Sequence, residues 1–579
     1  MLYFIAVWSL LGGVSWLMGT ALLHGWRADC FDRVGDRAMV ALWLGIGLLS
    51  QGLLLLSLGL PLSPMVGAGV AIASLLLLAW APVRADLSKL WRQVSWPLVV
   101  ATIAWVAVVA TYMTRRVTWY DTGLYHYGAI RWLSDYGAVP GLALLMENFG
   151  FTSAWFALAA PLNAAPIASQ VSAITNGLAL LLATGQGLMG LRRWLTGRAR
   201  FPDKFMVIFL GLVLPAMTLT SFLSAILLSP SPDIPVIFLT GMVAWSLLVV
   251  ANQPPLPSGS ATPSGWDATL IPLILATAAV SIKLSALPLL PVALLFYWRQ
   301  RPWTLRRLLV GGVLAAGLMV PFMAFGIITS GCPFYPSAAL CLEVPWRLSA
   351  AQADAAAEVI RIWDNAFGTP PAETNSLLWR LWQWLQFARL NVVMLVLLVV
   401  SILVVSIAGR GGTFGVARQH KLAGTPWLFG LSLLGMLFIL LRAPMIRFGL
   451  GYFVMTPAVA IALLRPFAVS RSHGRLPQGV SGQTLHNLIF LAFWAGFGVV
   501  GALHLLRSDM PARWLLPPAM PTTDVEVRQS YDVNYVSPNN DRGQCWDAPL
   551  PCAPGDKAIR LRNPAQGIDA GFVPADPAD

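Results

Sequence analysis

The stretch WPLVVATIAWVAVVATYMTRRVTWYDTGLYHYGAIRWLSDYGAVPG, residues 96–141, decides the fold. Residues 96–113 carry no charged side chain, and a helix that crosses a hydrocarbon core of ~30 Å needs roughly 20 such residues. Beyond them Leu124, Tyr127 and Ile130 recur at helical spacing among polar neighbours. This pattern predicts a membrane span followed by an amphipathic helix that lies on the membrane surface.

The composition of the whole chain agrees with a membrane protein. Of its 579 residues 57% are hydrophobic and 11% charged, whereas soluble domains carry about 25% charged residues. The 25 tryptophans and 26 phenylalanines suit aromatic belts at the two membrane interfaces. We interpret the net charge of +13 as an asymmetry between loops and not as nucleic-acid binding, because the basic residues gather between apolar runs.

Apolar runs along the chain predict an all-α polytopic membrane protein with about 14 transmembrane helices. They lie near residues 3–24, 38–60, 64–82, 96–113, 171–190, 205–228, 234–251, 268–285, 288–297, 308–329, 390–409, 425–441, 452–464 and 487–505. The first run could also be a signal peptide. We interpret it as a span, because Arg27, Asp29 and Asp32 follow it in place of a small-residue cleavage site.

The distribution of lysine and arginine predicts the orientation. With the N-terminus outside, more than half of these residues fall in the connections on the inner side, as the positive-inside rule requires. The large outer parts are then the connections 114–170 and 330–389 and the tail 506–579, which reads as a small extramembranous cap. We therefore expect a multi-pass membrane protein whose two termini both lie on the outer side of the membrane.

The cysteines fit this orientation. Cys332 and Cys341 share one outer connection, Cys545 and Cys552 share the tail, and Cys30 stands alone on the inner side. Pairs in an oxidising compartment and a single thiol in a reducing one are the expected partition, so we predict two local disulfides. Four unpaired thiols are the alternative, and metal binding is less favoured because no histidine lies near either pair.

Asp121 is the first candidate catalytic residue, because it places a carboxylate at the mouth of the bundle beside the surface helix. Such a carboxylate can act as a general base toward a hydroxyl or amine. The competing interpretation is that Asp121 caps the helix that starts at Thr122. His126 fits a hydrogen-bonded structural histidine better than a participant in the chemistry.

Four further charged residues stand at unusual positions. Asp233 occupies a turn between spans, where it can also serve as a helix cap, and Lys283 lies near the outer end of an apolar run, where snorkelling is the alternative. Arg442 and Arg447 flank a short outer turn against the positive-inside trend. Lys283, Arg442 and Arg447 could bind a phosphate, and interfacial anchoring is the alternative for the arginines.

Five segments together carry a resemblance. They are DTGLYHYGAIRWLSDYGAVPGL (121–142), SPSPD (229–233), SGCPFYPS (330–337), IRFG (446–449) and CWDAPLPC (545–552). With an acidic residue at the start of the first large outer loop, a surface helix after it and a second acidic turn, the chain resembles the GT-C glycosyltransferases. These polytopic enzymes use sugars linked to lipid phosphates. The five segments together look like an uncharacterised family of bacterial polytopic membrane proteins. This likeness implies a bacterial cytoplasmic (inner) membrane protein with both termini in the periplasm.

The GT-C resemblance implies roles for particular residues. Asp121 would be the catalytic base, and Asp233 the second acidic position, which helps to hold a divalent cation (Mg or Mn) in some members. The remaining implied residues are Tyr125, His126 and Glu147 as supporting or acceptor-binding groups, and Lys283, Arg442 and Arg447 as ligands of the carrier phosphate.

The implied function is a hexosyl- or pentosyltransferase that moves a sugar from a polyprenyl-phosphate-type carrier, with inversion, at the outer face of the membrane. Its partners would be the lipid-linked sugar donor, a glycan, lipid or protein acceptor, and membrane lipids. A transporter or flippase, or a polymerase or ligase, of lipid-linked saccharides is the alternative.

The resemblance also implies a division of the chain. Three N-terminal spans (1–95) would precede a GT-C-like core (96–330) that contains the first large periplasmic loop (114–170). A periplasmic loop with further spans (331–505) and the periplasmic tail (506–579) would follow. The chain departs from the family in these three preceding spans and in its lack of a DxD-type metal motif.

Overall fold

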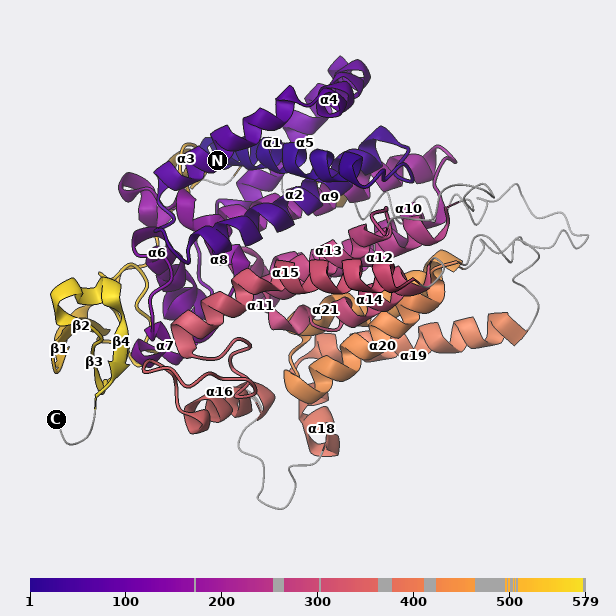
Figure 1. The fold of residues 1–579 in the computed structure, drawn as a ribbon. Helices are drawn as coiled ribbons and strands as arrows, with labels where there is room; N and C mark the ends of the chain where they lie inside the picture. Colours follow the sequence, from indigo (N-terminus) through magenta and orange to yellow (C-terminus); the bar gives the residue numbers. More distant parts are fainter. Residues whose placement is uncertain are drawn as a thin grey trace, which may run out of the picture.

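Long apolar helices make up most of the chain in the computed structural model (Figure 1), which describes residues 1–170, 173–253, 265–300, 304–362, 377–410, 423–463, 495–496, 498–499, 503, 506 and 509–575. The helices in order are α1 (Leu2–Gly25), α2 (Val34–Leu56), α3 (Pro64–Leu75), α4 (Ala81–Gln93), α5 (Trp96–Met113), α6 (Tyr127–Asp135), α7 (Leu142–Leu145), α8 (Ala154–Ala159), α9 (Ile174–Leu195), α10 (Phe201–Leu219), α11 (Ser221–Leu227), α12 (Asp233–Ala251), α13 (Leu270–Ile282), α14 (Leu289–Arg299), α15 (Leu305–Ser330), α16 (Ala350–Ile362), α18 (Leu377–Phe387), α19 (Arg389–Arg410), α20 (Thr425–Arg442) and α21 (Ile446–Leu463).

Ten of these helices are long and apolar enough to cross a membrane: α1, α2, α5, α9, α10, α12, α15, α19, α20 and α21. The protein is therefore built as a multi-pass membrane protein. Within this bundle α12 and α21 are buried along most of their length, whereas α19 exposes most of its apolar side chains. A lipid-facing surface explains that exposure, because hydrocarbon solvates such side chains as well as a protein core does.

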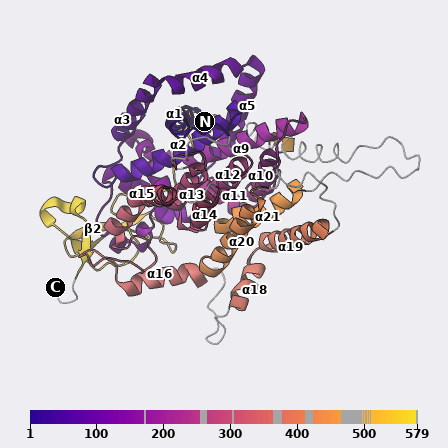
Figure 2. The same cartoon turned by 45° about the vertical axis from the view of Figure 1, so that its right-hand side comes forward.

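The expected number of about 14 spans is too high for the described residues. The expected span at 64–82 is α3 with a short 3₁₀ turn, and the chain then bends by 91° into α4, so the pair makes at most an eleventh span. Figure 2 shows α3, α4 and α5 forming an arch beside α1. Most of the expected last span, 487–505, lies outside the described residues.

The expected spans at 268–285 and 288–297 form a short hairpin instead. Helix α13 has 13 residues and α14 has 11, and they pack against each other. The two open ends of the hairpin meet, because the Tyr297 hydroxyl donates to the Gly265 carbonyl at 2.8 Å. A 13-residue helix is only about 20 Å long, which is short of a hydrocarbon core of ~30 Å.

The helix predicted after Asp121 is present and begins with an unforeseen π-helical turn, η2 (Thr122–His126), that continues into α6. The apolar stretch that follows folds back into the bundle. It contains α7, the 3₁₀ turn η3 (Glu147–Gly150), and α8, whose six residues are all buried. Helix α8 packs against α2 and α6, so this connection forms part of the core.

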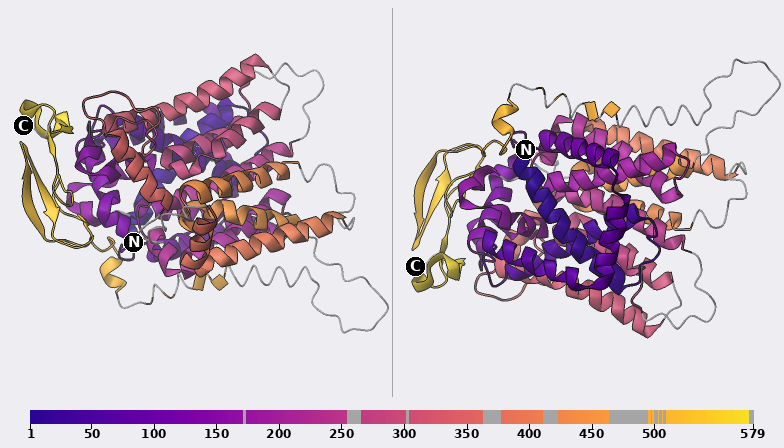
Figure 3. Two further views of the ribbon diagram at one scale, coloured as in Figure 1. Left: turned by 90° about the horizontal axis from the view of Figure 1, so that it is seen from below. Right: turned by 90° about the horizontal axis from the view of Figure 1, so that it is seen from above.

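The tail contains β-strands as well as two short 3₁₀ turns, η7 (Pro511–Arg513) and η8 (Pro564–Ala570), so the all-α expectation does not hold there. It contains two antiparallel pairs of strands, β1 (Val525–Ser530) with β2 (Val533–Pro538) and β3 (Ile559–Leu561) with β4 (Phe572–Pro574). Both views in Figure 3 show these strands at one end of the bundle. The N-terminus lies at the same end, because the Met1 ammonium donates to the Arg513 carbonyl at 2.7 Å.

Ion pairs fix the opposite end of the bundle. Arg33 donates to both oxygens of Asp203 at 2.8 Å, and Arg193 bridges Asp36 and Asp203 at 2.6 and 2.9 Å. These residues come from the connections 25–37 and 191–204, which the charge distribution assigned to one side of the membrane. The contacts bring the starts of α2 and α10 together with the end of α9.

Candidate functional site

Four charged side chains that are far apart in the sequence meet in one place: Asp121, Asp233, Lys283 and Arg447, here called the charged cluster. The Arg447 guanidinium donates to Asp121 Oδ2 at 2.7 Å, and its Nε lies 3.8 Å from Asp233 Oδ2. Lys283 forms an ion pair with Asp233 through Oδ1. The structure thus brings together the carboxylates and two of the three cations that sequence analysis singled out.

The ends of three helices hold the cluster. Asp233 is the first residue of α12, Arg447 the second of α21, and Lys283 ends α13 in an extended conformation at the tip of the hairpin. Asp121 follows α5 and precedes the turn η2. The N-termini of α12 and α21 therefore direct the positive ends of their helix dipoles at the cluster, which favours an anion there.

The charged cluster is recessed from the end of the bundle that carries the tail. Helices α13 and α15 start side by side, because Arg307 in the first turn of α15 pairs with Asp267 just before α13 at 2.8 Å. Helix α15 continues for 26 residues and α13 for only 13. At 1.5 Å per residue α15 extends roughly 20 Å farther along its axis, so Lys283 is recessed from the C-terminal end of α15.

Two aromatic residues complete the cluster, and sequence analysis missed both. Trp119 Nε1 donates to Asp121 Oδ2 at 3.2 Å, and the Arg447 guanidinium stands 5.0 Å from the Trp119 ring. Phe448 packs against both cations, with Lys283 Nζ 4.1 Å and the Arg447 guanidinium 4.6 Å from its ring centre. Cation–π contacts hold these side chains in place without occupying their hydrogen-bond donors. The sequence signal that could have identified Trp119 and Phe448 is that they lie beside Asp121 in TWYD and beside Arg447 in IRFG.

Asp121 does not cap the helix that follows it, because its side chain makes no capping hydrogen bond and binds Arg447 instead. Burial raises the pKa of its carboxyl, but the charge and hydrogen bond of Arg447 outweigh this and hold the pKa below its ordinary value. Asp121 is therefore a carboxylate at neutral pH. It remains a weak base while Arg447 is bound to it.

The turn η2 places Tyr125 and His126 next to Asp121. Their rings lie 4.5 Å apart, and the His126 ring lies 5.3 Å from Phe156 of α8. Burial lowers the pKa of His126 to about 3, so its imidazole is neutral. Among the described residues, His126 Nδ1 and Thr122 Oγ1 are buried without a hydrogen-bond partner. Buried polar atoms are normally satisfied, so these two atoms leave the turn beside Asp121 with unused hydrogen-bonding capacity.

Asp233 is held by the turn before α12 and does not cap that helix with its side chain. The Ser231 hydroxyl donates to Asp233 Oδ2 at 3.2 Å. Asn176 of α9 donates to the carbonyls of Ser229 and Ser231 at 2.5 and 3.1 Å, and accepts from Trp155 Nε1 at 2.8 Å. The buried Asn176 thus ties the Asp233 turn to the re-entrant helix α8.

Two predicted site residues take other positions. Arg442 ends α20, where a cation is favourable near the helix C-terminus, and among the described residues it makes no ion pair with the charged cluster. Glu147 stands in η3 and lines a separate pocket outside the charged cluster.

Both predicted cysteine pairs are confirmed. Cys332 is bonded to Cys341 and Cys545 to Cys552, while Cys30 is free. Within the described ranges the two bonds constrain the loop after α15 and the tail, both at the Met1 end of the bundle.

The cluster does not suit a divalent cation. A metal site needs several oxygen ligands turned toward one point, but here Arg447 bridges the two carboxylates and Lys283 holds the second. Among the described residues, no three His, Cys, Asp or Glu side chains gather as metal ligands. Two carboxylates with two cations instead form a neutral set that can exchange partners with an arriving anion.

Comparison with known proteins gives one match. No curated protein and no solved structure matches the chain. A family model described as a domain of unknown function, DUF8201, matches residues 1–454, a range that contains all four residues of the charged cluster and ends before the tail. Because this match spans well over half of the chain, the protein belongs to the DUF8201 family.

Proposed function

We propose that the protein is a membrane glycosyltransferase that moves a sugar from a polyprenyl-phosphate-type carrier to an acceptor at the outer face of the bacterial cytoplasmic membrane. The observation that carries this proposal is the contact between Asp121 and Arg447. It joins a candidate base to a candidate phosphate ligand inside a multi-pass membrane bundle. The likeness of the sequence to GT-C glycosyltransferases supports the same reaction.

The reaction assigns each charged residue a step. The carboxylate of Asp121 takes the proton of an acceptor hydroxyl, and the acceptor oxygen forms a bond to the anomeric carbon as the bond from that carbon to the phosphate oxygen breaks. The electron pair leaves on the carrier phosphate, whose charge Lys283 and Arg447 stabilise. Attack opposite the leaving phosphate inverts the anomeric centre.

Phosphate binding would also activate the base. Arg447 lowers the pKa of Asp121 in the free protein, and a bound phosphate competes for the same guanidinium. As Arg447 turns toward the phosphate, the Asp121 carboxylate loses its counter-charge and becomes a stronger base. Asp121 thus becomes a stronger base only when the donor is bound. Before the donor binds, Arg447 keeps the Asp121 carboxyl deprotonated.

The test compares Asp121→Asn with Asp135→Asn in a strain that lacks the native gene. Asp135 is an exposed carboxylate of α6 outside the charged cluster, so it controls for loss of an acidic side chain in the same segment. Surface glycans and lipids are analysed by mass spectrometry, and membranes are assayed with synthetic short-chain polyprenyl-phosphate hexoses and pentoses. We expect loss of one glycan modification and of transfer with Asp121→Asn alone, at normal protein levels. Unchanged glycans in the deletion strain, or full transfer by Asp121→Asn, would refute the proposal.

A transporter or flippase of lipid-linked saccharides is the second candidate, and the helix break at Lys283 favours it. Transporters place ionisable residues at broken helices within the membrane. The break here joins two helices that fold back on each other, whereas a transporter break interrupts one continuous span. Reconstitution separates the two, because a flippase moves a labelled lipid-linked saccharide across vesicles without forming a new glycosidic bond.

A further inference from the structure

A pocket of about 710 Å³ lies outside the charged cluster, at the end of the bundle that carries the tail. Four parts of the chain line it: Leu124 of η2, residues 143–148, residues 344–352 and residues 554–574 of the tail. Its volume falls within the range of about 300–1,000 Å³ that is usual for small-molecule sites.

Polar and charged side chains line this pocket. They are Glu147, Asn148, Arg347, Ser349, Gln352, Asp556 and Lys557. The formal charges of Glu147 and Asp556 cancel those of Arg347 and Lys557. Arg347 is also paired with Glu343, and Asp556 with Arg528 at 2.6 Å. The pocket therefore has many hydrogen-bonding groups and no net charge, which suits a neutral ligand rich in hydroxyl groups.

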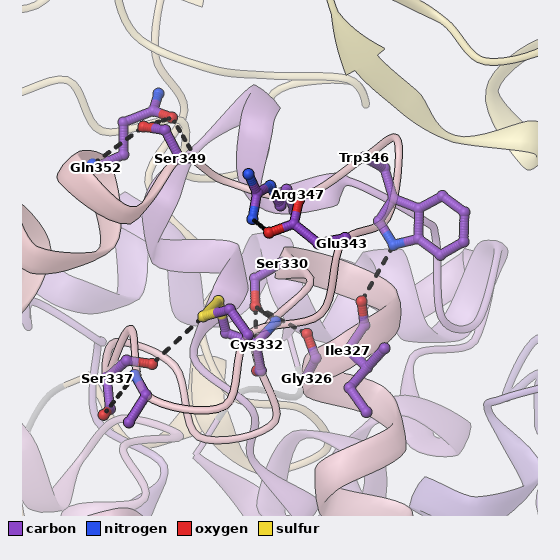
Figure 4. The surroundings of a disulfide bond; sticks show 12 residues. Gly326, Ile327, Ser330, Cys332, Ser337, Glu343, Trp346, Arg347, Ser349 and Gln352 are labelled. Atoms are coloured by element: carbon purple, nitrogen blue, oxygen red, sulfur yellow. Dashed lines mark hydrogen bonds and ion pairs between the residues drawn. A yellow bond between two sulfur atoms is a disulfide. The ribbon is translucent and has the colours of Figure 1, made fainter.

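The loop after α15 supplies a firm wall of the pocket. Its Cys332–Cys341 disulfide closes the first part of the loop, and Trp346 Nε1 donates to the Ile327 carbonyl at 3.1 Å. Ser349 and Gln352 bind each other through Oγ and Oε1 at 2.8 Å. Figure 4 shows these groups on the loop beside the end of α15, with Arg347 between them. Such fixed polar groups can orient a ligand with little ordering cost.

The tail supplies the opposite wall. Phe572 donates its N–H to the Pro140 carbonyl at 2.9 Å, and its buried ring shares a core with Trp132 and Leu145. Lys557 and Glu147 both line the pocket. Burial lowers the pKa of Lys557, while the nearby Glu147 charge opposes that shift. The two walls thus come from segments roughly 200 residues apart in sequence that meet over η3.

The pocket also reaches the turn that carries the candidate base. Leu124 lines the pocket and belongs to η2, which begins directly after Asp121. A ligand in the pocket therefore lies against the same turn of helix as Asp121. The cations of the charged cluster are not among the pocket's lining residues, so a carrier phosphate and a pocket ligand have separate sites.

We propose that this pocket binds the neutral, hydroxyl-rich saccharide portion of the acceptor, and that the acceptor is consequently a glycan. The role of this ligand as the acceptor rests on the proposed function, whereas its chemical class rests on the pocket alone. A phosphate would favour an excess of positive charge, and a lipid chain would favour a uniformly apolar lining. The described lining has a formal charge of zero and includes seven polar or charged residues.

The test uses the full chain in lipid nanodiscs and saturation-transfer NMR. The probes are the methyl glycosides of maltose, cellobiose and chitobiose, with glucose 1-phosphate and a neutral tetrapeptide as comparisons. Ala558→Trp fills the pocket from an exposed lining position, and Ala565→Trp makes the same change at an exposed tail position outside the lining. We expect at least one disaccharide to bind, and Ala558→Trp to weaken this binding about tenfold or more while Ala565→Trp does not.

The outcomes separate this inference from the proposed function. Disaccharide binding that survives Asp121→Asn and is lost with Ala558→Trp supports the pocket, whether or not Asp121→Asn abolishes transfer. Absence of disaccharide binding, equal binding by Ala558→Trp, or tighter binding of the phosphate or the peptide overturns the inference. In that case loss of transfer with Asp121→Asn would still support the enzyme.

Discussion

At the scale of single residues, Arg447 connects the two carboxylates of the charged cluster. It binds Asp121 directly and approaches Asp233, and it is only 6% exposed. Removing one partner of a buried ion pair leaves the other charge uncompensated, which is costly. Substitution of Arg447 should therefore change the titration of Asp121 and also destabilise the fold.

Arg447→Gln should raise the pKa of Asp121, because burial remains while the opposing positive charge is lost. In the native protein this carboxyl has a lowered pKa. Its ion pair therefore stabilises the fold at pH values above the pKa of Asp121 in the unfolded chain. This stabilisation is lost as the pH falls through the pKa of Asp121 in the folded protein. The variant lacks that stabilisation at neutral pH. Infrared difference spectroscopy of the Asp121 carboxyl measures the titration directly.

Arg442→Gln is the matched control for this titration, because Arg442 precedes Arg447 by one short turn and makes no ion pair with the cluster among the described residues. It should leave the Asp121 band unmoved. An Asp121 titration that is the same in the native protein and in Arg447→Gln would contradict the assigned contact.

Metal removal should have little effect on transfer. Since Arg447 and Lys283 occupy both carboxylates, no divalent cation is needed for charge balance in the cluster. Treatment of the reconstituted protein with EDTA should change the transfer rate by less than about twofold, and added Mg²⁺ or Mn²⁺ should not raise it. A rate that disappears with EDTA and returns with Mn²⁺ would show that Asp233 leaves Lys283 to bind a metal.

At the scale of elements, the turn before α12 depends on a hydrogen-bond network from a neighbouring helix. Asn176 accepts one hydrogen bond and donates two, and all of these groups are buried. This network sets the position of Asp233 relative to α8. It follows that a substitution in α9, outside the cluster, can displace one of the cluster carboxylates.

Asn176→Leu should lower the free energy of unfolding by about 1–3 kcal/mol. Leucine has a shape similar to that of asparagine but leaves the buried partners of Asn176 without their hydrogen bonds. Tryptophan fluorescence during unfolding in mixed detergent micelles gives the measurement. Thr196→Val is the comparison, since it removes an exposed side-chain hydrogen bond to the Arg192 carbonyl at the end of the same helix. Equal stability of the two variants would argue against the network.

The sequence predicted the elements that follow from local patterns. The span at 96–113, the helix after Asp121 and the two disulfides were correct because hydropathy, helical periodicity and cysteine spacing are local signals. The α13–α14 hairpin was mistaken for two full spans, because its apolar residues face protein rather than lipid and composition does not distinguish the two. The π-helical turn depends on tertiary contacts that one sequence does not contain. The roles of Trp119 and Phe448 depend on such contacts too, and their adjacency to Asp121 and Arg447 is the local signal for them.

At the scale of the whole molecule, the tail is docked onto the turn that follows Asp121. Trp546 donates its N–H to the Gly123 carbonyl at 3.0 Å, and Gln544 donates to the Tyr120 carbonyl at 2.9 Å. The Cys545–Cys552 disulfide brackets Trp546. A β-carbon at Gly123 would lie 2.3 Å from the Trp546 ring, so this glycine is required for the docking.

Gly123→Val should release the tail from the bundle, because the added side chain overlaps the Trp546 indole. Limited proteolysis of the protein in nanodiscs should then cleave the tail several-fold faster, whereas Gly69→Val, which meets no atom within 4 Å, should leave the cleavage rate unchanged. Native resistance in Gly123→Val would mean that the tail docks through its strands alone.

The equal numbers of cations and carboxylates in the cluster have a consequence for the proposed reaction. The four charges of Asp121, Asp233, Lys283 and Arg447 sum to zero. A bound carrier phosphodiester with one negative charge therefore gives the occupied site one excess negative charge. Transfer of the acceptor proton to Asp121 would place a compensating charge on the protein as the leaving phosphate gains its own. Proton uptake and departure of the carrier are thereby electrically coupled, and the rate of release should follow the ease with which Asp121 returns its proton to water.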